Sequence, residues 1–108
     1  MISIMDLQKL NQTDIATITR FVDRIRRNKS RYNQEQQALL DLANKSLTEI
    51  IEVCKDLNGP AKKDTIITKP FNDRRLRKVK EVLLAITDKI SDLKDSAYTV
   101  LAILGKID

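Results

Sequence analysis

The sequence has no histidine and only one cysteine, and these two shortages exclude most site chemistry at once. Without histidine there is no imidazole general base, no His-based catalytic triad and no histidine zinc ligand. Cys54 alone can form neither an intrachain disulfide nor a metal site, and a single thiol suits a reducing compartment. The opening "MISIMDL" lacks the cationic stretch of an export signal. We therefore expect a cytoplasmic protein with no catalytic residue and no metal.

Glycine and proline are scarce as well, with two residues of each. Gly59-Pro60 follows one periodic segment and Gly105 follows another, so there is no glycine-rich loop for a phosphate cofactor or substrate. We expect no cofactor and no small-molecule substrate. The longest nearly apolar run, residues 97–104, falls far short of the ~20 residues that span a bilayer, so we expect no membrane partner. The composition, 42% apolar and 32% charged, indicates one globular domain over residues 1–108.

Helix-favouring residues dominate the rest of the sequence, and its apolar residues recur at spacings of three and four. This pattern predicts an all-α antiparallel bundle of three main helices, at about 13–28, 33–57 and 72–105. Upstream, Ile4, Leu7 and Leu10 repeat every three residues, which predicts a short helix starting near Asp6 or a direct lead into the first main helix. Residues 28–33 favour a turn, with one continuous helix as the alternative.

Local signals mark the helix starts. Thr13 is the expected N-cap of the first helix, with Asp14 favourable in its first turn. Asn33 and Gln36 have the spacing of a capping box for the second helix, in which each side chain accepts from the other residue's backbone N–H. Cys54 lies on the apolar seam of that helix. We therefore expect a buried, unreactive thiol.

The third predicted helix carries an apolar stripe that alternates four and three from Leu76 to Ile107. A helix of about 33 residues would reach ~50 Å, whereas the second helix would reach ~36 Å. The excess predicts a contact with a second copy, as a homodimer, or with another protein. If the chain is instead monomeric, the first helix and the N-terminal segment must cover the tail. The predicted partner-binding residues are Leu93, Ala97, Val100, Leu101 and Leu104.

The positive charge falls into two clusters, residues 20–31 and 69–80, each with six cations and one anion. The second cluster lies at the start of a helix, where each cation costs about 0.3–1 kcal/mol. One explanation is internal: an antiparallel neighbour would bring Glu49, Glu52 and Asp56 beside these cations. The other explanation is a phosphate-bearing partner.

A nucleic-acid-binding accessory protein is therefore the alternative to a protein-interaction module. The residues predicted for it are Arg24, Arg26, Arg27, Arg74, Arg75 and Arg77. Against it, no aromatic interleaving suggests base stacking, no known DNA- or RNA-binding motif is present, and a simple antiparallel bundle puts the clusters at opposite ends. The favoured prediction is a non-enzymatic interaction module of adaptor, inhibitor, immunity or chaperone type that acts through its long helix.

Overall fold

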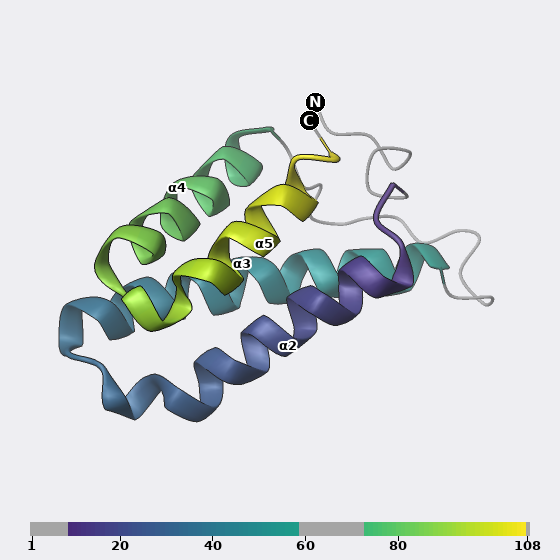
Figure 1. Cartoon of the computed structure of the whole chain (residues 1–108). Helices are drawn as coiled ribbons and strands as arrows, with labels where there is room; N and C mark the ends of the chain where they lie inside the picture. Colours follow the sequence, from purple (N-terminus) through teal and green to yellow (C-terminus); the bar gives the residue numbers. More distant parts are fainter. Residues whose placement is uncertain (1–8, 59–72, 108) are drawn as a thin grey trace.

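The computed structural model describes residues 9–58 and 73–107, and Figure 1 shows that this part of the chain is helical. Its elements are α2 (Gln12–Asn28), the 3-10 helix η1 (Lys29–Arg31), α3 (Gln34–Asn58), α4 (Asp73–Lys89), the 3-10 helix η2 (Ser91–Leu93) and α5 (Lys94–Leu104). The predicted all-α class is confirmed, but these residues form four α-helices rather than three. The short helix predicted near Asp6 and the connector with Gly59 and Pro60 lie outside the described residues.

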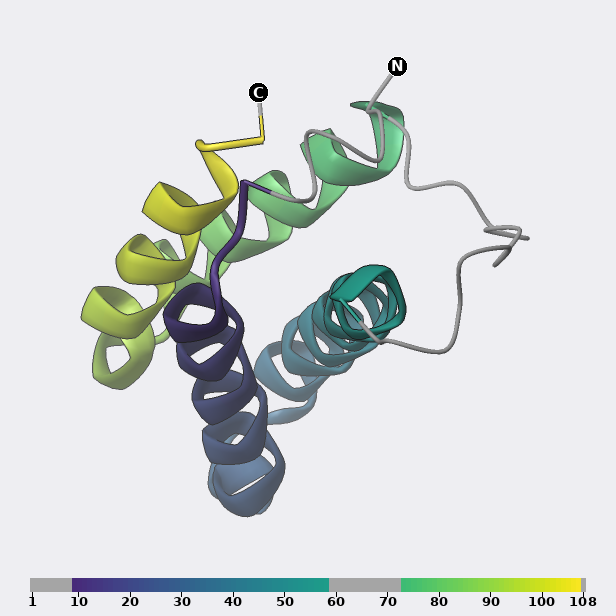
Figure 2. The ribbon, with the colours of Figure 1, turned by 90° about the vertical axis from the view of Figure 1, so that its right-hand side faces the viewer.

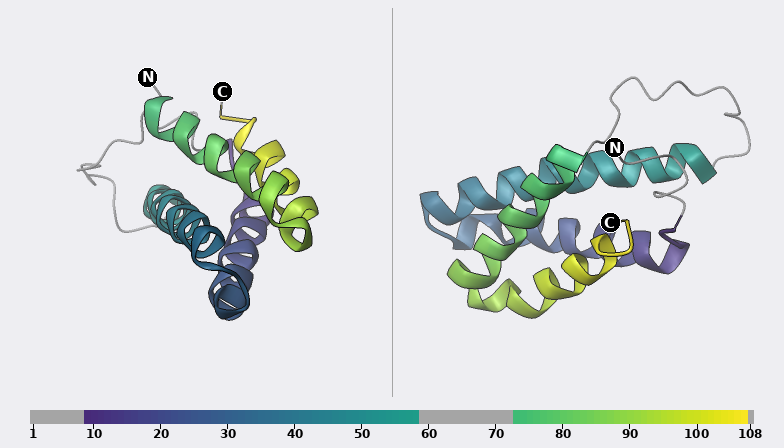
Figure 3. Two further views of the ribbon diagram at one scale, coloured as in Figure 1. Left: turned by 90° about the vertical axis from the view of Figure 1, so that its left-hand side faces the viewer. Right: turned by 90° about the horizontal axis from the view of Figure 1, so that it is seen from above.

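The four helices pack as two pairs laid against each other. End-on views place α2 beside α3 on one side and α4 beside α5 on the other (Figures 2 and 3). Between the pairs, α3 packs on α4 and α2 packs on α5. Glu35 near the start of α3 binds Lys89 at the end of α4, so these two helices run in opposite directions. This contact lowers the pKa of Glu35 and raises that of Lys89.

The prediction of a single helix over 72–105 is wrong, because the helix is interrupted by a corner at Ile90. Its backbone leaves the helical region at φ −129° and ψ 89°, and η2 follows before α5 begins. The corner keeps its own hydrogen bonds, from Ile90 N to the Ile86 carbonyl oxygen at 2.8 Å and from Leu93 N to the Ile90 carbonyl oxygen at 3.1 Å. Ile90 is 2% exposed and Leu93 0% exposed. Both point into the core, so the chain turns and α5 folds back on α4 (Figure 1).

The first helix begins two residues earlier than predicted, because Asn11 and not Thr13 is its N-cap. The Asp14 N–H donates to Asn11 Oδ1 at 2.8 Å, and the Asn11 N–H donates to Asp14 Oδ2 at 3.1 Å. This reciprocal pair satisfies two backbone donors that Thr13 would leave open. Asp14 also accepts from Lys106 Nζ at 2.9 Å, which ties the start of α2 to the residues that follow α5.

The second predicted capping box is confirmed. The Gln36 N–H donates to Asn33 Oδ1 at 2.8 Å, and the Asn33 N–H donates to Gln36 Oε1 at 3.2 Å. The turn between the first two helices is confirmed as well, since α2 ends at Asn28 and α3 starts at Gln34. A continuous helix through residues 28–33 is therefore wrong.

One hydrophobic core joins all four helices. Ile18 of α2, Leu47 of α3, Leu83 of α4 and Leu104 of α5 are each 0% exposed. Leu10, which precedes α2, is 2% exposed and belongs to the same cluster. In the described ranges, no helix is both long enough and apolar enough to cross a bilayer.

Candidate functional site

The residues predicted to bind a partner lie in the core of the single chain. Leu93, Ala97, Val100 and Leu104 are each 0% exposed, and Leu101 is half-buried against the core. They are covered by α4 and α2, because the corner turns α5 back along both helices. The third helix therefore does not extend beyond the second, and the reason for expecting a partner at this stripe is removed.

The basic residues at the start of α4 are only partly paired within the chain. Arg75 forms the expected ion pair with Glu49. Arg74 and Arg77 are exposed and make no hydrogen bond or ion pair with another described residue. The predicted pairing with Asp56 falls on a side chain outside the description. Among the residues that the structure describes, internal pairing thus accounts for one of the three arginines.

The basic residues of α2 divide in the same way. Arg24 reaches α5, where Nη1 donates to Ser96 Oγ at 3.0 Å and Nη2 donates to the Asp92 carbonyl oxygen at 3.2 Å. Arg26 and Arg27 are exposed, and neither contacts another described residue through a hydrogen bond or an ion pair.

The two basic clusters flank the same helix instead of lying at opposite ends of the molecule. Lys29 binds Asp41 at 2.6 Å, and Arg75 binds Glu49. Asp41 and Glu49 are two turns apart on α3, which is ~12 Å along the helix axis. The expectation of opposite ends is wrong because the start of α4 meets the middle of α3, not its end.

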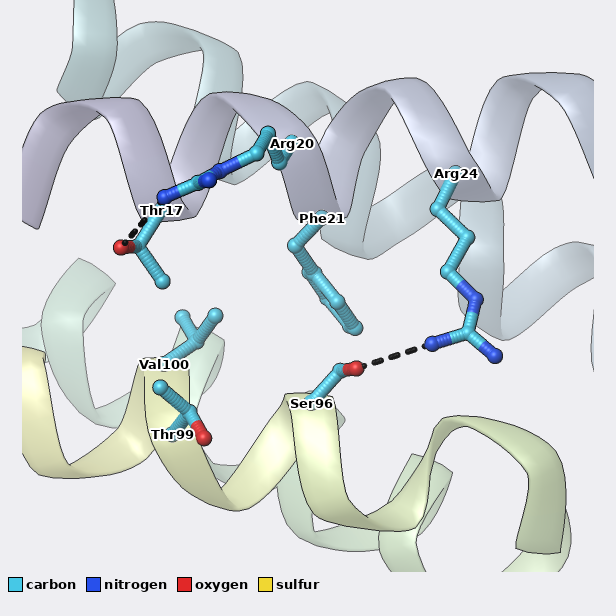
Figure 4. Close-up of a pocket in the computed structure, with 7 residues that line it drawn as sticks. All are labelled: Thr17, Arg20, Phe21, Arg24, Ser96, Thr99 and Val100. Atoms are coloured by element: carbon cyan, nitrogen blue, oxygen red, sulfur yellow. Dashed lines mark hydrogen bonds between the residues drawn. The ribbon is translucent and has the colours of Figure 1, made fainter.

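A small pocket lies between α2 and α5, and Figure 4 shows the side chains around it. Its volume is about 240 Å³. Phe21 and Val100 are buried at its base, while two guanidinium groups and three hydroxyls supply the polar atoms. We call it the α2–α5 pocket, and it is lined by Thr17, Arg20, Phe21, Arg24, Ser96, Thr99 and Val100.

A larger, shallow groove lies on the other flank of α2, against the last turns of α3. Its volume is about 620 Å³ and its lining is mostly apolar. Arg20 and Lys55 are exposed at its rim, and neither forms an ion pair with another described residue. We call it the α2–α3 groove, and it is lined by Gln12, Ile15, Ala16, Thr19, Arg20 and Lys55.

Of the pocket residues, the sequence analysis named Arg24 as a candidate for nucleic-acid binding and Val100 as a candidate for partner binding. Arg20 is four positions before Arg24 on the same helix, and i,i+4 residues share a helix face, so its position was available as a signal. Ser96 and Thr99 come from α5 and face α2 only because the chain turns at Ile90. No local pattern marks them.

Cys54 is buried as predicted, at 1% exposure. Burial disfavours the thiolate and raises the pKa of this thiol to about 11. Since a thiolate is the reactive form, the group is unsuited to nucleophilic chemistry. Among the residues described, no group of three histidine, cysteine, aspartate or glutamate side chains is placed to hold a metal ion.

Together these features define a small all-α domain with a polar pocket and an apolar groove on the two flanks of one helix. Comparison with protein-family models, with curated proteins and with solved structures gives no match. A functional assignment therefore depends on the chemistry of these two sites and of the exposed arginines.

Proposed function

We propose that this chain is a non-enzymatic protein-interaction module of adaptor, inhibitor or chaperone type, with the α2–α3 groove as its docking surface. The observation that carries the proposal is an open, mostly apolar groove whose two rim cations form no ion pair within the described part of the chain. The free thiol of Cys54 suits the reducing cytoplasm, where we place the protein.

The groove is suited to an amphipathic helix of another protein. It follows about two turns of α2, from Gln12 to Arg20, with Lys55 of α3 at its edge, so a partner helix can lie along α2 with its apolar face inward. Ala16 is exposed and small, which lets a partner backbone approach closely, and Ile15 beside it is half-buried. Arg20 and Lys55 favour carboxylates at the flanks of that helix. We therefore assign the groove to a partner helix that carries apolar residues one turn apart and acidic residues beside them.

Filling the groove should abolish capture of such a partner. Ala16→Trp places an indole where the partner helix would lie, and we expect at least a tenfold loss of a protein captured from nuclease-treated lysate of the native cell. Ala102→Trp is the matched control, because Ala102 is exposed on α5, away from the groove. Arg20→Glu with Lys55→Glu should weaken capture through the rim charges. Equal capture by the wild type and the Ala16 variant would contradict the proposal.

A second candidate function, an accessory protein for nucleic acid, is favoured by the exposed arginines. Arg26, Arg27, Arg74 and Arg77 are exposed without an ion pair to any described residue. One member of each cluster, Lys29 and Arg75, pairs with α3, and their partners Asp41 and Glu49 lie ~12 Å apart along its axis. Phosphate groups along a nucleic-acid backbone are a suitable partner for such a distribution.

The salt dependence of binding tests this second candidate. Changing these four arginines to glutamine should weaken binding to DNA or RNA and flatten the plot of log K against log salt by up to ~0.9 per lost contact on duplex DNA. Arg75→Gln is the control, since Arg75 is paired with Glu49 and its loss should cost about 1 kcal/mol of stability or less. Absence of binding to either nucleic acid at low salt removes this candidate.

A further inference from the structure

We infer that the α2–α5 pocket is a binding site for a phosphate group. The inference goes beyond the proposed interaction function, because it concerns the side of α2 that faces α5 and a different kind of ligand, although Arg20 borders both sites. Figure 4 shows Arg24 reaching from α2 towards α5, Arg20 lying back along α2 towards Thr17, and Phe21 between them. Two guanidinium groups thus border one small space.

The guanidinium of Arg24 is held in place before any ligand binds. It donates to Ser96 Oγ at 3.0 Å and to the Asp92 carbonyl oxygen at 3.2 Å. Arg20 makes only a long contact, from Nη2 to Thr17 Oγ1 at 3.5 Å. Each guanidinium carries five N–H donors in a planar fork that matches phosphate oxygens. Several donors of both groups therefore remain available at the pocket.

The three hydroxyl groups at the pocket differ in whether their protons are already used in a hydrogen bond. Thr17 Oγ1 donates to the Thr13 carbonyl oxygen at 2.9 Å, and Thr99 Oγ1 donates to the Asp95 carbonyl oxygen at 3.0 Å. Ser96 Oγ accepts from Arg24, so its own proton is free to donate. The donors left for a ligand thus come from Arg24 and Ser96, which lie side by side, and from Arg20, which reaches the same phosphate once its side chain leaves Thr17.

No carboxylate lines the pocket, so its two positive charges are not balanced by a residue in its wall. Ser96 belongs to the first turn of α5, whose cap has no side-chain hydrogen bond, and the positive end of that helix adds to the field there. Asp95 lies in the same turn but is not a lining residue. The local electrostatics therefore favour an anion.

The size of the pocket favours a single phosphate group over a whole cofactor. Its volume of about 240 Å³ is well above the ~10–15 Å³ that a single water needs. Sites for drug-sized ligands are larger, ~300–1,000 Å³. A phosphate group fits with part of its hydration shell, and the rest of the ligand would extend into solvent. Inorganic phosphate, a phosphomonoester and a backbone phosphate of nucleic acid share this chemistry.

Titration of ¹⁵N-labelled protein with sodium phosphate, against sodium chloride at equal ionic strength, tests the site. We expect saturable shifts of backbone amides in residues 17–24 and 92–100. Arg20→Gln and Arg24→Lys should each weaken binding about tenfold, the size expected for one charge-assisted hydrogen bond. Arg27→Gln is the matched control, with the same loss of charge on the same helix outside the pocket, and should change affinity less than twofold.

A second arm compares glycerol phosphate with a short single-stranded oligonucleotide. Tighter binding of the oligonucleotide, still weakened by Arg20→Gln, assigns the site to a nucleic-acid backbone. Tighter binding of glycerol phosphate assigns it to a small phosphorylated ligand. Lys55→Glu changes a residue of the groove that does not line the pocket and should leave phosphate binding intact, so failure of the groove proposal does not affect this one. Absence of saturable shifts, or an equal loss with Arg27→Gln, would overturn the inference.

Discussion

Leu104→Asp is expected to abolish the folded state at pH 7, whereas Leu101→Asp should leave a folded but weakened protein. Leu104 is 0% exposed, while Leu101 is half-buried at the edge of the core. Loss of one buried leucine costs about 1.5–3 kcal/mol, and burial of a carboxylate adds several more. A small domain has a total stability of only about 5–15 kcal/mol. Circular dichroism and urea unfolding of the two variants measure the difference.

The pH dependence of the Leu104 variant gives a second reading of burial. A carboxyl group forced into the core has a folded-state pKa above its unfolded value, so its destabilising effect grows as the pH rises above the unfolded pKa. Lowering the pH towards 4 should therefore restore helix content in part. If residues 93–107 instead formed a subunit interface, the double variant at Leu101 and Leu104 would stay helical and only its sedimentation mass would fall.

The parts of the fold that could be predicted are those set by neighbours in the sequence. The capping box of Asn33 and Gln36 is formed by residues three positions apart, and the turn over 28–33 is marked by a gap in apolar content. Burial of Cys54 follows from its place on a regular apolar seam. The N-cap was misplaced because Asn11 and Thr13 are both good capping residues, and only the backbone geometry decides between them.

The corner at Ile90 escaped prediction for a different reason. A regular apolar spacing reports which residues are buried, but not whether the chain continues straight through them. Ile90 and Leu93 are both buried at the turn, so the alternation of four and three passes through it unchanged. The one local signal was Ser91-Asp92, two residues that favour a helix start.

The α2–α5 pocket depends on that corner, whereas the α2–α3 groove depends on the packing of α2 on α3. Both sites join residues far apart in the sequence, so no local pattern predicts either of them. The α2–α5 pocket joins Arg24 to Ser96 across 72 positions of sequence. The α2–α3 groove joins Gln12 to Lys55 in a similar way. The individual charged residues can be read from the sequence. Which of them lie together depends on which helices pack against each other.

The distance between positions 77 and 102 should separate the folded-back arrangement from one long helix. In a continuous helix their Cα atoms would be ~38 Å apart, at 1.5 Å per residue. In the structure α5 packs against α4, and packed helix axes are 8–10 Å apart, so we expect about 10–20 Å. Arg77 and Ala102 are both exposed, and Arg77→Cys with Ala102→Cys permits spin labelling while Cys54 stays buried.

Dipolar electron paramagnetic resonance measures this distance in solution. Labels at Arg77 and Asp88 form the control, because both positions lie in α4 and their separation of ~17 Å is the same in either arrangement. A distance near 38 Å for the test pair would restore the long helix and, with it, the uncovered apolar stripe that predicts a partner at Leu93, Ala97, Val100, Leu101 and Leu104. A short distance leaves that stripe in the core and supports the turn at Ile90, which the α2–α5 pocket requires.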